Sequence, residues 1–372
     1  MTSAPDFTQL AAAHGIELDK DASMLRVGGA DAEYFGAMAR DASGAYWMLR
    51  APRRGDVQLA GRQEAVVLGF VRGKIPVVLP DWQVHTDKLS AYRVLPGVPA
   101  AEIDPLMGEL IWRLPQDRVP ETFAESLALM MVKLHSLDVG AAATAGIPAV
   151  TAGDIRSRMK LRMDECNTLA PVPEKLWGLW QKWIDGDDFW PGHIALVNGD
   201  IYHPHLFVDA DYKLIGVDDW SGAEVTDPSV DFSLYFASAG REALEDLIRR
   251  YERAGGRTWP RMADQAEMYY WASPVRFAAY AMKTGDLSHL MNVRNMVHRY
   301  ASMLEDSGFT SGRRNFRRPR HYPVSPHADG VTRAGGAVVV RVAGGSAASD
   351  GAVGQVGAGA DRRRRGERLA FG

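Results

Sequence analysis

Residues 197–208 (VNGDIYHPHLFV) and 214–220 (LIGVDDW) form the most informative stretch of this sequence. Two short apolar runs, rich in strand-forming residues, flank a polar segment, and this pattern predicts a β-hairpin with a tight turn. Asp200 and His205 precede the hairpin, and Asp219 follows it. Because a hairpin brings its two ends together, the two carboxylates and the imidazole can meet. Such a group suits a divalent cation together with a general base.

The same stretch resembles the catalytic loop and the metal-binding aspartate of the aminoglycoside phosphotransferase family, a branch of the protein-kinase-like fold. Within that family it is most similar to the macrolide 2′-phosphotransferases, because His205 stands where the aminoglycoside branch usually has asparagine. The resemblance extends from about residue 14 to about residue 304. The residues that carry it are Gly199, Asp200, Ile201, Tyr202, His205, Asp219, Trp220, Ser221, Glu224, Asp227, Pro228 and Asp231.

The resemblance implies an α+β, two-lobed protein-kinase-like fold. We expect a small N-terminal lobe over residues 1–96, with an antiparallel sheet and one helix, to bind the nucleotide. A larger, mostly helical lobe over residues 97–308 is expected to hold the catalytic and substrate-binding residues. The Arg-, Gly- and Ala-rich residues 309–372 have little to bury, and we expect them to be a disordered tail. A length of 372 residues is ample for two domains.

Local patterns agree with this division. In the N-terminal part, apolar patterns predict helices over residues 6–14 and 57–73 and strands over residues 24–27, 34–39, 46–50, 75–84 and 90–97. In the C-terminal part, helical periodicity covers residues 119–137, 151–166, 173–186, 241–253, 260–283 and 285–305, and a further helix is expected to start at residues 227–231.

A nucleotide site is expected in the small lobe. Arg50 ends the third predicted strand, where kinase-like proteins usually carry a lysine that holds the nucleotide phosphates. Residues 49–54 (LRAPRR) are similar to a stretch of the macrolide branch, and arginine can bind phosphate oxygens with a bidentate fork. The fold implies that Glu64 pairs with Arg50, although an ordinary solvated helix glutamate is the alternative.

Two further segments complete the expected nucleotide site. The turn that contains Gly29 would cover the phosphates with backbone N–H groups, although an ordinary meander turn is the alternative. Arg93, Val94 and Leu95 lie at the exit from the small lobe. In this fold the exit segment is the hinge, and its backbone groups bind the edge of the purine.

Aromatic residues and one acid are expected in the substrate pocket. In the macrolide branch an acidic residue at the position of Asp231 faces the pocket, where it could pair with the protonated dimethylamino group of a desosamine sugar. Tyr202, Tyr270, Trp271 and Phe277 would supply an apolar wall for a large acceptor. Burial within helices is the alternative for many of these aromatic residues. It is also the favoured explanation of the stripe formed by Trp177, Trp180 and Trp183.

The resemblance implies phosphoryl transfer. His205 and Asp219 would hold Mg²⁺, Asp200 would orient and deprotonate the accepting hydroxyl, and Arg50 would neutralise phosphate charge. The donor would be GTP, which the macrolide branch tends to use, or ATP. The product would be a macrolide phosphorylated on its 2′-hydroxyl, so the activity would give antibiotic resistance.

One residue departs from the family pattern. Asn198 stands where a histidine usually precedes Gly-Asp and braces the loop, so we expect a less rigid loop and weaker catalysis. Two alternatives stay open. The first is transfer to another hydroxyl compound, such as an aminoglycoside, choline or a sugar. The second is a nucleotide-binding regulatory protein that transfers nothing.

Composition narrows the remaining possibilities. Hydrophobic residues make up 46% and charged residues 24% of the chain, as in globular proteins, and the net charge of −3 gives no reason to expect nucleic acid as a partner. No apolar run is long enough to span a membrane, and the first residues do not resemble a signal peptide. We therefore expect a cytoplasmic monomer. Cys166, the single cysteine, is expected to be a small buried hydrophobe, and His135 a packed structural histidine.

Overall fold

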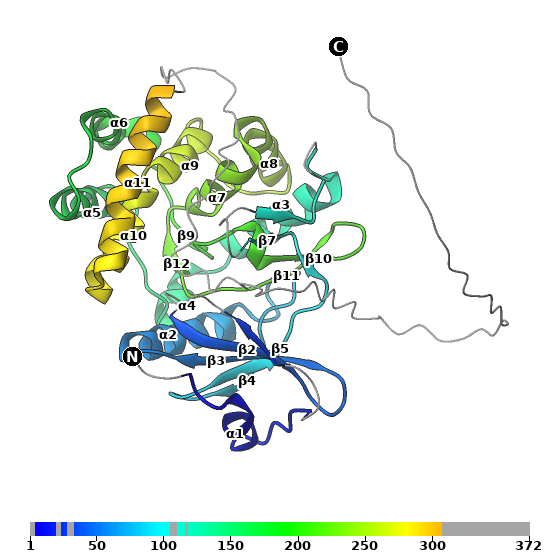
Figure 1. Ribbon diagram of the computed structural model, residues 1–372. Helices are drawn as coiled ribbons and strands as arrows, with labels where there is room; N and C mark the ends of the chain where they lie inside the picture. Colours follow the sequence, from blue (N-terminus) through cyan, green and yellow to red (C-terminus); the bar gives the residue numbers. More distant parts are fainter. Residues whose placement is uncertain (1–3, 20–23, 28–32, 105–109, 116–117, 307–372) are drawn as a thin grey trace, which may run out of the picture. The chain divides into compact units, whose positions relative to one another are not determined.

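The computed structural model (Figure 1) describes the residues 4–19, 24–27, 33–104, 110–115 and 118–306. The chain separates into two units, Met1–Val339 and Val340–Gly372, and every described residue lies in the first unit. The predicted tail over residues 309–372 and the turn that contains Gly29 lie outside the described residues. None of the helices in the described part combines the length and apolar character that a membrane span requires.

The N-terminal part is a five-stranded antiparallel sheet with the strand order β1-β2-β3-β5-β4. Its strands are β1 (Leu25–Val27), β2 (Tyr34–Arg40), β3 (Tyr46–Pro52), β4 (Trp82–His85) and β5 (Ser90–Arg93). Helices α1 (Phe7–Ala12) and α2 (Gly55–Val71) lie on opposite sides of this sheet (Figure 1).

Strand alternation explains how the sheet positions Arg50. Successive side chains of a strand point to opposite faces, and Trp47, Leu49 and Ala51 of β3 join the apolar cluster that contains Phe7 of α1. Arg50 therefore points to the other face, toward α2.

The predicted strand over residues 75–84 is shorter than expected. Only β4, from Trp82, belongs to the sheet. Pro76 and Pro80 lack the N–H group that a strand interior needs. Val78, between them, instead pairs with the hairpin of the C-terminal part, since its N–H donates to the carbonyl of Ile215 at 2.8 Å and its carbonyl accepts from Val217 at 3.1 Å.

The predicted hairpin is confirmed, and it belongs to a set of small sheets. Strands β10 (Leu206–Val208) and β11 (Leu214–Val217) pair antiparallel, with Leu206 opposite Val217. The other short strands are β6 (Val98–Pro99), which pairs with β10, β7 (Ala101–Ile103) with β8 (Leu110–Trp112), and β9 (Ala195–Val197) with β12 (Glu224–Thr226).

The remaining regular elements of the described chain are helices. The α-helices are α3 (Glu121–His135), α4 (Val139–Thr144), α5 (Ile155–Leu169), α6 (Glu174–Asp185), α7 (Val230–Ala239), α8 (Arg241–Arg253), α9 (Met262–Trp271), α10 (Ser273–Thr284) and α11 (Leu287–Asp306). Two short 3₁₀ helices are η1 (Asp187–Phe189) and η2 (His203–His205). The single helix expected over residues 260–283 is wrong, because α9 ends and α10 begins at Ala272. Pro274 has no N–H for the helical ladder, which explains the break.

A large apolar cluster connects these helices to the hairpin. Trp180 and Trp183 of α6 are buried in it, so the core interpretation of the tryptophan stripe is confirmed. Their indole N–H groups are satisfied by the carbonyl of Trp271 at 3.0 Å and by the side chain of Gln265 at 2.6 Å. Cys166 is buried here as expected.

Candidate active site

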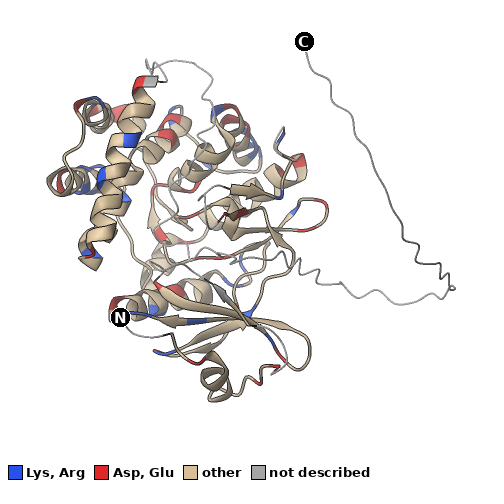
Figure 2. Cartoon of the chain, viewed as in Figure 1, with Lys and Arg blue, Asp and Glu red and all other residues tan. Residues whose placement is uncertain are grey.

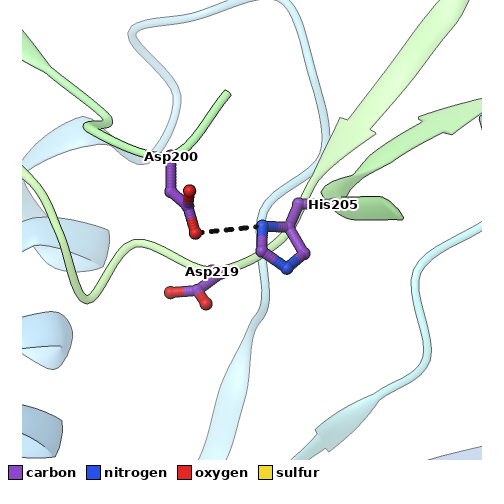
Figure 3. A group of neighbouring side chains, drawn as sticks. All are labelled: Asp200, His205 and Asp219. Atoms are coloured by element: carbon purple, nitrogen blue, oxygen red, sulfur yellow. Dashed lines mark ion pairs between the residues drawn. The ribbon is translucent and has the colours of Figure 1, made fainter. Parts of the chain in front are cut away.

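The hairpin brings together the three side chains that its sequence singled out (Figure 3). Ligand atoms of Asp200, His205 and Asp219 all lie within 4.8 Å of one another, and all three residues are buried. Nδ1 of His205 is 3.5 Å from a carboxylate oxygen of Asp200. Asp200 comes from the loop after β9, His205 from η2 directly before β10, and Asp219 from the loop after β11.

Backbone constraints hold Asp219 in place. Its φ of 51° lies in the left-handed region, which a residue with a Cβ adopts at a cost, and such strained positions are typical of functional sites. The carboxylate of Asp218 accepts a hydrogen bond from the Asp219 N–H at 2.9 Å. The Asp219 carboxylate in turn accepts from Ser221, from the backbone N–H at 3.1 Å and from the hydroxyl at 2.6 Å.

The donor set fits a divalent cation. Two carboxylates and an imidazole offer ligands of the right chemistry, and Nδ1 of His205 makes no hydrogen bond to any residue in the described part. Burial acts to lower the pKa of His205, but the neighbouring Asp200, Asp219 and Asp218 outweigh it and raise this pKa. A bound cation would compensate the negative charge of these buried carboxylates.

Asn198 connects the two loops that carry Asp200 and Asp219. The buried Asn198 side chain donates to the carbonyl of Asp219 at 2.8 Å and accepts from the N–H of Asp200 at 2.9 Å. One amide therefore ties the loop of Asp200 to the loop of Asp219. The less rigid loop and weaker catalysis expected from the missing histidine stay predictions.

Asp231 lies inside the protein rather than on the wall of a pocket, which corrects its predicted placement. It is 1% exposed, and its carboxylate accepts from the backbone N–H groups of Asn198 at 3.1 Å and Gly199 at 2.7 Å. His135 pairs with the same carboxylate at 3.0 Å and contacts the hydroxyl of Tyr251 at 3.0 Å. Asp231 thus fixes the backbone that carries Asp200, and the structural role expected of His135 is confirmed.

The predicted pairing of Arg50 with Glu64 is confirmed at 3.4 Å. Both side chains are buried, and the guanidinium also stacks over the ring of Tyr34, 4.1 Å from its centre. The second oxygen of Glu64 accepts from the backbone N–H of Trp220 at 3.3 Å. Glu64 therefore connects β3 to the segment that follows Asp219.

The three residues of the predicted hinge, Arg93, Val94 and Leu95, differ from one another in their contacts. The N–H of Val94 donates to the carbonyl of Tyr46 at 3.0 Å, which continues the pairing of β3 with β5. The guanidinium of Arg93 pairs with Asp41 at 2.6 Å and lies over the ring of Trp47. Leu95 is buried.

A cavity of about 370 Å³ lies beside the catalytic loop. It is bounded by α5, α7 and α10 and by the segments around Gly199 and around Ser221–Glu224, and its lining includes Arg158, Arg162, Arg276, Glu224 and Tyr269. Its volume falls within the range of small-molecule sites, roughly 300–1,000 Å³. The position next to Gly199 makes it the candidate acceptor pocket.

The aromatic residues predicted to bind substrate do not line this cavity. Tyr270 and Trp271 are core residues, at most 1% exposed. Tyr202 is buried with its ring edge toward His205, and Phe277 packs against the core. Each helical residue turns the side chain by about 100°, so α9 presents Tyr269 to the cavity and buries its neighbour Tyr270.

The arginines that line the cavity were not predicted from the sequence. Arg158 binds Glu224 through two hydrogen bonds of 2.8 Å, and Arg276 donates to the backbone carbonyl of Gly199 at 3.0 Å. A usable pattern was present, because Arg162 shares one helical face with the buried Ile155 and with Met159. A basic residue on the inward face of an amphipathic helix points to a polar cavity.

A model of the phosphotransferase enzyme family matches residues 32–264. The chain belongs to this family. A relative in Bacillus subtilis (strain 168), the uncharacterized protein YcbJ, is 34% identical over 281 residues, which cover 76% of this chain and 91% of that protein. The protein is therefore a small-molecule phosphotransferase.

Solved structures agree with the predicted fold. A structure of macrolide 2′-phosphotransferase type I is 33% identical, with a TM-score of 0.72, covering 80% of this chain and 99% of that one. The apoenzyme of macrolide 2′-phosphotransferase MphH from Brachybacterium faecium is 30% identical, with a TM-score of 0.69 and coverage of 77% and 96%. The GDP complex of an aminoglycoside 2′-phosphotransferase-IIIa mutant, 16% identical with a TM-score of 0.66 and coverage of 82% and 99%, resembles the chain in fold. The protein-kinase-like fold is confirmed, and relatives of this fold bind nucleotides.

Proposed function

We propose that the protein is a macrolide 2′-phosphotransferase that moves the γ-phosphate of GTP, or of ATP, to the 2′-hydroxyl of a desosamine sugar. The convergence of Asp200, His205 and Asp219 beside an acceptor cavity supports phosphoryl transfer. The likeness to two macrolide enzymes at 30% identity or more supports the acceptor.

In this proposal Asp200 is the base. Its carboxylate orients the accepting hydroxyl and takes its proton as the hydroxyl oxygen bonds to the γ-phosphorus, while the bond from that phosphorus to the β-phosphate oxygen breaks. The nucleoside diphosphate is the leaving group. Asp231, Asn198 and Arg276 contribute by fixing the loop that carries Asp200. Such positioning is a large part of the catalysis of phosphoryl transfer.

The other charges of the site would act on the nucleotide. His205 and Asp219 would hold Mg²⁺, which supplies positive charge to the transferring phosphate when it is bound. Arg50, held in place by Glu64 and Tyr34, would bind phosphate oxygens. Because the Val94 N–H is engaged by Tyr46, the proposed contacts to the purine edge are the carbonyl of Val94 and the backbone of Leu95.

The direct test is phosphate transfer by purified protein with Mg²⁺ and either GTP or ATP. Mass spectrometry should show one added phosphate on erythromycin and none on kanamycin. Asp200→Ala should abolish transfer and leave nucleotide binding, measured by calorimetry, largely intact. Asp185→Ala, which removes an exposed carboxylate at the end of α6, is the matched control and should transfer at the wild-type rate.

Three results would contradict the proposal. Transfer to kanamycin alone would place the acceptor in the aminoglycoside class, and transfer that survives Asp200→Ala would remove Asp200 from the mechanism. Binding of GTP or ATP without transfer to any acceptor would favour the regulatory alternative.

A further inference from the structure

The candidate acceptor cavity has an unbalanced charge. Its lining carries four basic side chains, Arg158, Arg162, Arg276 and Lys283, against one carboxylate, Glu224. The basic residues of this lining lie on α5 and α10, and Figure 2 draws Lys and Arg in blue. Aminoglycosides carry several ammonium groups, and this lining repels them.

Three of the four basic groups already have partners in the protein. Arg158 is bound to Glu224 and also contacts the hydroxyl of Thr226 at 3.1 Å. Arg276 donates to the carbonyl of Gly199. Lys283 pairs at 3.5 Å with Asp56 of α2 and is half-exposed. These contacts hold the three charged groups in fixed positions in the cavity wall.

Arg162 differs from the other three. It is half-buried, and it makes no hydrogen bond or ion pair to another residue in the described part of the chain. Burial lowers the pKa of Arg162, and the nearby Arg158 and Arg276 add to this effect, while Glu224 and Glu165 act against it without hydrogen-bonding to the guanidinium. An arginine presents five donors in a planar fork, and half-buried donors without acceptors favour a ligand that supplies them.

The remaining lining mixes hydroxyl side chains, such as those of Ser233 and Tyr269, with apolar ones. Ile155 and Met159 of α5 and Val275 and Ala279 of α10 contribute only carbon or sulfur atoms from their side chains. An acceptor molecule that fits must therefore combine an apolar body with oxygen acceptors. The single carboxylate, already shared with Arg158, allows at most a small positive charge on it.

We propose that Arg162 is a recognition residue of the acceptor site. It donates hydrogen bonds to carbonyl, hydroxyl or carboxylate oxygens of an oxygen-rich, largely apolar acceptor, and the positive lining excludes polycations. This inference rests on the proposed phosphoryl transfer from the neighbouring loop. It concerns the charge and oxygen content of the acceptor. A macrolide has these properties, and so do other classes of compound.

The test combines three acceptors with three variants. Erythromycin has one amine, chloramphenicol is neutral and kanamycin is a polyamine. Release of nucleoside diphosphate is measured for wild type, Arg162→Ala and Arg162→Lys. Lys160→Ala is the control, since Lys160 lies two residues away on α5, is half-exposed and pairs only locally with Asp164. Thermal unfolding verifies that every variant is folded.

The inference predicts a selective effect on the KM of the acceptor. Arg162→Ala should raise that KM by about tenfold or more, the loss of a hydrogen bond from a charged donor, and leave kcat and the KM of the nucleotide nearly unchanged. Arg162→Lys should recover part of the affinity, and Lys160→Ala should match wild type. A structural role alone would instead lower the unfolding temperature and kcat together.

The outcomes separate this inference from the proposed function. If erythromycin is phosphorylated and its KM is unchanged in Arg162→Ala, the function stands and the recognition role is overturned. If only chloramphenicol is phosphorylated and its KM depends on Arg162, the recognition role stands and the macrolide assignment fails. Efficient transfer to kanamycin would overturn the exclusion of polycations.

Discussion

Gly199 combines a positive φ with a close backbone contact. Its φ is 81°, and a Cβ at this position would lie 2.4 Å from the carbonyl oxygen of Gly222 and 3.1 Å from its carbonyl carbon. Backbone atoms cannot yield as a flexible side chain does, so Gly199→Ala must displace the loop that carries Asp200. We expect kcat to fall at least about a hundredfold, because small displacements of a reacting group are that damaging.

Gly73 offers a matched control for this substitution. Its φ of 74° is similar, but nothing lies within 4 Å of a Cβ built there. Gly73→Ala should therefore show only the conformational cost of the left-handed region, roughly 1–2 kcal/mol, with kcat unchanged. Thermal unfolding and steady-state kinetics of both variants make the comparison. Equal activity of the two variants would contradict the importance of the Gly199–Gly222 approach.

Asn198 is a second residue with a defined chemical requirement. Asn198→Asp keeps an oxygen that can accept from Asp200 but loses the N–H donor to the carbonyl of Asp219, and it adds a negative charge to a site rich in carboxylates. We expect kcat to fall by about an order of magnitude and the free energy of unfolding by about 1–3 kcal/mol. Kinetics and denaturant unfolding test this. Wild-type kcat in Asn198→Asp would show that the bracing is dispensable.

At the scale of residues, the three side chains of the hairpin could be predicted from the sequence. The residues that hold them in place, such as Asp231, could not. Asp200, His205 and Asp219 are close in the chain and separated by a recognisable turn, so local pattern alone predicts their meeting. Asp231 bonds to backbone N–H groups more than thirty positions away. That contact depends on how α7 is rotated against β9, and no local pattern contains this information.

Among the elements, the turn between β2 and β3 is organised by one carboxylate. Asp41 accepts from the N–H groups of Ser43 and Ala45, from the indole of Trp47 at 3.0 Å and from Arg93 at 2.6 Å. Burial acts to raise the pKa of Asp41, but the hydrogen bonds from Ser43, Trp47 and Arg93 outweigh it and hold this pKa well below its usual range. The contact to Arg93 ties the turn to β5.

This carboxylate predicts a dependence of stability on pH. A group with a depressed folded-state pKa stabilises the protein above its unfolded pKa, about 3.9 for aspartate, and the contribution is lost as the pH falls toward the folded value. Asp41→Asn should therefore lower the unfolding temperature at pH 7, and the difference from wild type should shrink below about pH 4. Asp185→Asn, at an exposed position, is the control. A difference that is constant with pH would contradict the assignment.

The presence of a helix was predictable where the apolar periodicity was strong. The residues at which helices and strands begin and end were not predictable. The helices α3, α5, α6, α8 and α11 match the periodic segments of the sequence. The break between α9 and α10 was missed because both flanks are apolar and helical, and only Pro274 marks it. The very short strands β6, β7, β8, β9 and β12 carry too few residues to show a pattern, and they form because distant segments present a pairing edge.

For the whole molecule, the residues assigned to chemistry in the described part of the chain lie between Arg50 and Lys283. The family match likewise covers residues 32–264. A chain ended after Asp306 should therefore bind nucleotide and transfer phosphate as the full chain does, within experimental error, and unfold at the same temperature. Side-by-side kinetics and calorimetry of the two chains provide the measurement. Loss of transfer in the shorter chain would assign a function to the basic C-terminal segment.

The overall architecture was predictable because several motifs occur in the right order along the chain. The acceptor pocket was not, because its wall is assembled from α5, α7 and α10, which are far apart in sequence. Tyr270 and Trp271 illustrate the difficulty. Composition showed that α9 is aromatic, but only the packed structure shows which aromatic residue faces the cavity.

The Asp231–His135–Tyr251 contacts have a consequence for how such a protein can evolve. They anchor the loop that carries Asp200 from α3, α7 and α8, whereas Arg158 of α5 hydrogen-bonds to Glu224 and Thr226, outside that loop. Substitutions on α5 can therefore change which acceptors bind with a smaller effect on kcat. Arg276 couples α10 to Gly199. We therefore expect substitutions that change the acceptor to occur first on α5, and to occur on α10 only together with compensating substitutions.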